Sequence, residues 1–121
     1  MSTNAQIAVE HDDNTISSIY CHFDGYIQGG AGEALVNAVR TLPAAEELIK
    51  AGDLRYVQNN NGQVDAESYN VFRGEEIKIN TFNNLTDFVD QAQWEEFNYL
   101  FIDGQWRLID ANTYKLVKDF L

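Results

Sequence analysis

Residues 17–26 read Ser17-Ser18-Ile19-Tyr20-Cys21-His22-Phe23-Asp24-Gly25-Tyr26, the pattern of a strand that runs into a glycine turn. Successive side chains on a strand point to opposite faces of its sheet. One face therefore carries Ile19, Cys21 and Phe23, which predicts core. The other carries Tyr20, His22 and Asp24, which predicts a polar surface. This stretch also holds the only cysteine and one of the two histidines.

The flanking sequence predicts a single α+β domain over residues 1–121, a mainly antiparallel sheet with three to four short helices packed on it. Apolar periodicity predicts strands at residues 5–10, 16–23, 53–57 and 75–82, and helices at 31–40, 43–51 and 84–92. Residues 58–63 are polar and predict a loop with a turn at Asn61-Gly62.

The C-terminal part of the chain contains the strongest hairpin signal. Asp103-Gly104 lies between two apolar runs and predicts a hairpin over residues 96–109. This register places Phe101 opposite Trp106 and leaves apolar side chains on both faces, so we expect the hairpin to be covered on both sides. Asn112 is then predicted to cap a last helix whose inward face carries Tyr114, Val117, Phe120 and Leu121.

Composition narrows the class of protein. Hydrophobic residues make up 45% of the 121 residues, enough for a core. A single cysteine forms no internal disulfide, which favours a reducing, cytoplasmic setting, and no apolar run reaches the roughly 18 residues of a membrane span. The N-terminus has no leader pattern.

Charge is the most unusual bulk property of the chain. Asp and Glu number 19 against 8 Lys and Arg, a formal net charge of −11. Eight of the acids fall in residues 1–60 and eleven in residues 61–121, so the excess belongs to the folded body rather than to a tail. Such a surface repels nucleic acid and anionic membranes and attracts basic partners, so neither direct nucleic-acid binding nor membrane binding is expected.

The side chains of residues 20–24 offer two further hypotheses. Cys21 and His22 point to opposite faces of a strand and therefore do not form a nucleophile pair. His22 and Asp24 share a face and would suit acid–base chemistry or a metal, with Tyr20 completing a polar site. A metal would need further ligands, for which His11, Asp12 and Asp13 are the nearest candidates. A surface histidine beside a turn-capping Asp explains the same residues, so no catalytic, metal or cofactor site is predicted.

The stretch Ser18-Ile19-Tyr20-Cys21-His22-Phe23-Asp24-Gly25-Tyr26 resembles a motif of small proteins encoded by bacteriophages and mobile elements, in which Trp is usual at the position of Phe23. The likeness continues through residues 47–54 and 99–106. It implies phage origin rather than one activity. Small acidic phage proteins are often inhibitors of host defence, and anti-CRISPR or anti-restriction proteins can present carboxylates where phosphates would lie.

Charge and resemblance together predict a non-enzymatic inhibitor in the host bacterial cytoplasm, which binds a basic nucleic-acid-binding surface of a defence nuclease or CRISPR effector. The predicted contact residues form two acidic patches: Asp87, Asp90, Glu95 and Glu96 in the first, and Asp12, Asp13 and Asp24 in the second. Two alternatives remain open. One is an enzyme or metal module centred on His22 and Asp24. The other is a self-associating accessory protein, a homodimer joined through the aromatic side chains of the hairpin.

Overall fold

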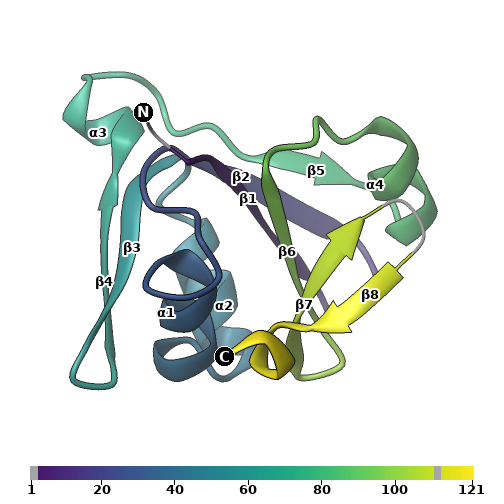
Figure 1. Cartoon of the computed structure of the whole chain (residues 1–121). Coiled ribbons are helices and arrows are strands. Elements are labelled where there is room, and N and C mark those ends of the chain that lie inside the picture. The colour runs from purple at the N-terminus through teal and green to yellow at the C-terminus, as the bar shows by residue number, and fades with distance from the viewer. Residues whose placement is uncertain (1–2, 111–112) are drawn as a thin grey trace.

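The computed structural model describes residues 3–110 and 113–121, which form one α+β domain on an open eight-stranded sheet (Figure 1). The strands are β1 (Ala5–Glu10), β2 (Ile16–Cys21), β3 (Leu54–Asn60), β4 (Gln63–Ser68), β5 (Asn80–Phe82), β6 (Phe97–Ile102), β7 (Gln105–Asp110) and β8 (Thr113–Leu116). Their order is β4-β3-β2-β1-β6-β7-β8, with β5 also paired to β2. Only the β1–β6 and β2–β3 pairs are parallel. The predicted fold class is confirmed.

Short helices pack on this sheet. They are α1 (Ala31–Ala38), α2 (Leu42–Ile49), α3 (Tyr69–Phe72), α4 (Leu85–Gln91) and the 3-10 helix η1 (Val117–Phe120). Side-chain caps start three of them: Thr41 accepts a hydrogen bond from the Ala44 N–H, Ser68 from the Val71 N–H and Asn84 from the Asp87 N–H. Within the described residues, no helix is long and apolar enough to cross a bilayer.

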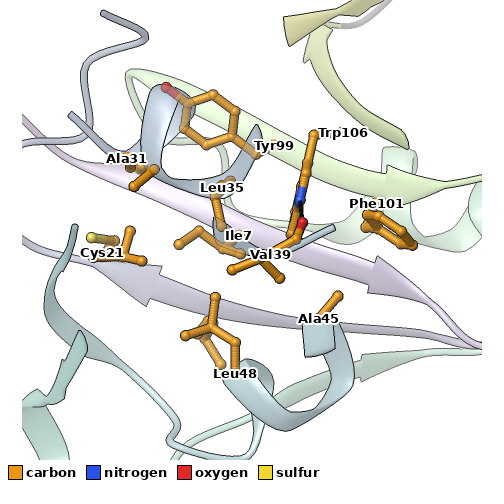
Figure 2. Close-up of a cluster of buried hydrophobic side chains, with 14 of the residues drawn as sticks. Ile7, Cys21, Ala31, Leu35, Val39, Ala45, Leu48, Tyr99, Phe101 and Trp106 are labelled. Atoms are coloured by element: carbon orange, nitrogen blue, oxygen red, sulfur yellow. Dashed lines mark hydrogen bonds between the residues drawn. The ribbon is translucent and has the colours of Figure 1, made fainter. Parts of the chain in front are cut away.

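The main core lies between one face of the sheet and helices α1 and α2. Figure 2 shows Ile7 and Cys21 from the central strands beneath Leu35 and Ala31 of α1, with Val39 beside Ile7 and Leu48 of α2 on the other side of the strands. Buried polar groups are tied to the backbone: Trp106 Nε1–H donates to the Val39 carbonyl at 2.7 Å, and Tyr99 O–H donates to the Gly25 carbonyl at 2.6 Å. These bonds fix the hairpin aromatics inside the core.

The opposite face of the sheet is divided into an apolar and a polar half. Ala8, Ile16 and Leu100 pack under Phe88 of α4 in a second buried cluster. The same face continues, at every second position of these strands, with the polar side chains of Gln6, Ser18, Tyr20 and Asn98. Because α4 is only seven residues long, it covers the apolar half and leaves the polar half to form a pocket.

Four local predictions from the sequence are wrong. Residues 58–63 belong to the β3–β4 hairpin rather than to a loop, although the turn at Asn61-Gly62 is where it was expected. The strand predicted at residues 75–82 is only the three-residue β5. Residues 113–116 pair with β7 instead of forming a helix, and Phe120 and Leu121 are exposed. Phe23 lies beyond the end of β2 and is also exposed. The predicted cap, Asn112, is outside the described residues.

Candidate functional site

The outer edge of β2 changes partner halfway along its length. Residues Ile16 to Ser18 pair with β5, whereas Cys21 pairs with Leu54 of β3. Between these two ladders, the Tyr20 N–H donates to the Asp53 carboxylate at 3.1 Å. A side chain thus replaces a strand at the one point where neither neighbour reaches β2.

Asp53 is held at this junction by its own backbone. Its N–H donates to Asn70 Oδ1 at 2.9 Å, and its carbonyl accepts from the Tyr69 N–H at 2.7 Å. Asn70 is 2% exposed, and its Oδ1 also accepts from the Lys78 N–H at 3.0 Å. The carboxylate is therefore positioned by a buried amide that joins three segments of the chain.

A polar pocket of about 410 Å³ opens beside this junction. Its lining combines two carboxylates, one ammonium group and several uncharged hydrogen-bonding groups, contributed by Gln6, Ser18, Ile19, Tyr20, Asp53, Lys78, Asn80, Gln93 and Glu95. It contains Tyr20 from the predicted polar site and Glu95 from the first predicted acidic patch. We call it the junction pocket.

Ser18 is the least satisfied group in the junction pocket. The residue is 1% exposed, and its Oγ has no hydrogen-bond partner among the described residues. A buried hydroxyl without a partner costs roughly 1–3 kcal/mol. A ligand with a donor or acceptor aimed at this hydroxyl would recover that cost.

Glu95 contributes to the junction pocket a carboxylate whose ionised form is disfavoured by its surroundings. Burial, followed by the negative charge of Glu96, raises the pKa of Glu95 above its usual value. Burial and the Glu95 charge likewise raise the pKa of Tyr20. Asn98 fixes the segment, since its Oδ1 accepts from the Glu95 N–H at 2.9 Å and its Nδ2 donates to the Glu95 carbonyl at 3.0 Å. A cation in the pocket would favour the ionised form of Glu95.

The predicted polar site is only partly assembled. Tyr20 Oη and His22 Nδ1 are 2.8 Å apart, and the His22 ring packs against Tyr69 with centroids 5.2 Å apart. The structure does not join Asp24 to them: this exposed residue has φ of +57°, and its carbonyl accepts from the Ala31 N–H. Regular alternation ends with β2 at Cys21, so the expectation of a shared face does not extend to Asp24.

The first predicted acidic patch lies on one continuous segment of the chain, whereas the second is divided between the two ends of β2. Asp87 and Asp90 lie three residues apart on α4, and Glu95 and Glu96 follow on the segment that leads into β6. Among the described residues, the ion pairs involve other acids and leave these four without a basic partner. The second set is divided, because Asp12 and Asp13 occupy the β1–β2 turn while Asp24 lies past the other end of β2, about 20 Å away along the strand.

The structure also bears on two other hypotheses, self-association through the hairpin and a metal site. The hairpin aromatics Tyr99, Phe101 and Trp106 are at most 4% exposed and belong to the core, whereas Phe97 is partly buried, so among these four only Phe97 could contribute to an interface between copies. In the part of the chain that the structure describes, no group of three or more His, Cys, Asp or Glu side chains could hold a metal ion.

Sequence reasoning missed Gln6, Ser18, Asp53 and Lys78. Gln6 interrupts the apolar run of residues 5–9 in β1, and its Nε2 donates to Asn98 Oδ1 at 3.1 Å. The available signal for the Gln6–Asn98 hydrogen bond was a polar residue among apolar ones in each of two strands, Gln6 in β1 and Asn98 in β6. No known protein family, curated protein or solved structure matches the chain.

Proposed function

We propose that the protein is a phage-encoded inhibitor whose inhibition is non-enzymatic, and that it binds a basic nucleic-acid-binding surface of a bacterial defence nuclease or CRISPR effector. The observation that carries this proposal is the junction pocket, with Asp53, Glu95 and the unpartnered Ser18 hydroxyl in its lining. A guanidinium group has several donors in a planar fork, which suits two carboxylates and a hydroxyl. An arginine from the target would enter this pocket.

The surface around the pocket supports the same proposal. Asp87, Asp90 and Glu96 form no ion pair with a basic side chain among the described residues. They lie on α4 and on the segment between α4 and β6, which contains Glu95. Carboxylates of this kind attract a basic channel over long range and compete there with phosphates. The net charge of −11 adds to the rate of encounter.

The first experiment is capture from bacterial lysate with the tagged protein at low salt, followed by elution in a salt gradient and mass spectrometry. We expect a nuclease or CRISPR component that elutes as salt rises, because screening weakens contacts between exposed charges. Retention that does not change with salt would contradict binding through acidic patches.

Charge variants make the test specific. The double variant Asp90→Asn/Glu96→Gln removes two exposed charges of the first acidic patch and should weaken binding at least about tenfold. Asp103→Asn/Asp119→Asn is the matched control, because it changes the net charge equally at the β6–β7 turn and on η1, at the far end of the hairpin (Figure 1). Equal losses in both variants would assign the effect to net charge alone.

A further inference from the structure

A chain of short hydrogen bonds lies on the other face of the sheet, away from the junction pocket. Ser17 Oγ is 2.7 Å from His11 Nε2, and His11 Nδ1 is 2.6 Å from Glu46 Oε2. Because a carboxylate only accepts, His11 Nδ1 donates to Glu46, and in the tautomer with its single hydrogen on Nδ1 the Nε2 atom accepts from the Ser17 hydroxyl. The three groups stand in the order nucleophile, base and orienting acid.

The fold explains why these distant residues meet. Ser17 lies opposite Val9 in the β1–β2 ladder, and His11 follows two residues after Val9. Backbone bonds from the His11 N–H to the Thr15 carbonyl and from the Asn14 N–H to the His11 carbonyl close the turn, which holds His11 beside Ser17. Glu46 reaches the ring from α2, the helix that packs on the same face.

We infer that Ser17, His11 and Glu46 form an acyl-transfer site that hydrolyses small esters. In the first step Ser17 Oγ bonds to the acyl carbon and its proton moves to His11 Nε2. The bond from that carbon to the alcohol oxygen then breaks, and His11 returns the proton to the departing alcohol. Water next attacks the acyl-serine, His11 accepts its proton, and the acid leaves as the proton returns to Ser17 Oγ. Glu46 is a positioning residue, which orients His11.

The surroundings indicate the substrate class. Ser17 and His11 line a pocket of about 500 Å³ together with Pro43, Ile49, Ile79 and Lys50. Its apolar members suit a short, uncharged acyl chain. Lys50 brings a positive charge, the sign that stabilises the oxyanion of an acyl-transfer intermediate, although in the free protein its Nζ lies 3.4 Å from Glu47 Oε2.

This site goes beyond the proposed binding function. The inhibition proposed above needs no catalysis, and the two sites lie on opposite faces of the sheet, so either proposal can fail alone. The competing explanation of the hydrogen bonds is structural, a tie between the β1–β2 turn and α2. A structural tie affects stability but does not make Ser17 a nucleophile.

The test is covalent labelling of the whole chain with an alkyl fluorophosphonate, which reacts with activated serines, followed by peptide mapping. The expected result is one adduct on Ser17. Ser68→Ala is the matched control and should label as the wild type does, since Ser68 lies at the start of α3, outside the pocket that Ser17 lines. A folded wild-type protein without an adduct on Ser17 would overturn the inference.

Two variants separate activation from structure. His11→Gln should slow labelling at least about a hundredfold, because it removes the base. Glu46→Gln retains a hydrogen-bond acceptor but loses the charge, so it should slow labelling while Glu46→Asp restores part of the rate. Rates that are unchanged in His11→Gln would refute activation by His11, and unchanged rates in Glu46→Gln would remove the role of Glu46. The wild-type protein should also hydrolyse p-nitrophenyl acetate, and Ser17→Ala should abolish this activity. This assay checks that the labelled serine turns over an ester substrate.

Discussion

The chemistry of Cys21 is strongly set by its surroundings. Its side chain lies in the main core (Figure 2), and burial raises the pKa of the thiol to about 12. The thiolate is the reactive form, so almost none is present near neutral pH. We expect the folded protein to react with a thiol-specific disulfide reagent at pH 8 at least about a hundredfold more slowly than the protein in denaturant.

The same reaction has an internal reference, since the denatured chain should release one equivalent of chromophore. Cys21→Ser should release none in either state. Rapid reaction of the folded wild type would show that the strand opens around Cys21, or that the thiol is far less buried than its 0% exposure indicates.

Ser17 and Ser18 show what alternation along a strand can and cannot predict. Their opposite orientations follow from the sequence, since Ile19 and Cys21 are core-facing. The distant residues that complete the two sites do not follow from the sequence. Glu46, which completes the chain of hydrogen bonds from Ser17, is 29 residues further on, and Asp53 of the junction pocket follows the end of α2. Only the packing of α2 on the sheet brings these side chains to β2.

At the scale of elements, the connection between α2 and β3 depends on Gly52. This residue has φ of +71°, and a Cβ atom there would lie 2.5 Å from Asn70 Oδ1 and 2.8 Å from Ile77 Cγ2. The Asn70 amide also holds Asp53 and Lys78. Gly52→Ala should therefore lower the free energy of unfolding by about 2–4 kcal/mol, through backbone strain and the loss of buried hydrogen bonds. Urea denaturation measures this loss.

Gly62 provides the matched control for that variant. It too has positive φ, +86°, but a Cβ atom at this turn would have no neighbouring atom within 4 Å. Gly62→Ala should therefore cost only the backbone strain, about 1 kcal/mol. Equal losses in the two variants would show that the Asn70 contact does not stabilise the α2–β3 connection.

Elements were predictable from sequence where local chemistry decides them. Asp103-Gly104 and Asn61-Gly62 adopt positive φ in their turns, and Asn84 caps α4 at the start of the helix predicted over residues 84–92. Prediction failed where pairing with a distant strand decides. The segment Thr113–Leu116 becomes β8 because β7 offers it an edge, and residues 75–79 form no strand because β2 pairs with β5 only at residues 80–82. The junction pocket depends on that same change of partner along β2.

At the scale of the whole molecule, the excess of carboxylates destabilises the fold through mutual repulsion. Burial disfavours the ionised form of two of these carboxyls, Glu10 and Glu95. Burial, and then the charge of Asp103, raises the pKa of Glu10, while burial, and then Glu96, raises that of Glu95. Both groups ionise less readily in the folded than in the unfolded chain. Their contribution to stability is therefore present below the unfolded pKa and is lost as pH rises through the folded pKa.

The melting temperature should consequently rise when the pH falls from 8 to 5, the opposite of what paired carboxylates would give. Both carboxyls are mostly solvated, so screening limits the rise to roughly 2–4 °C, measured by circular dichroism. Glu10→Gln/Glu95→Gln should flatten this dependence, whereas the exposed pair Glu76→Gln/Asp119→Asn should not. A melting temperature that falls between pH 8 and pH 5 would show that ionised Glu10 and Glu95 stabilise the fold. In that case a cationic group of the target would gain no affinity by favouring the ionised form of Glu95 in the junction pocket.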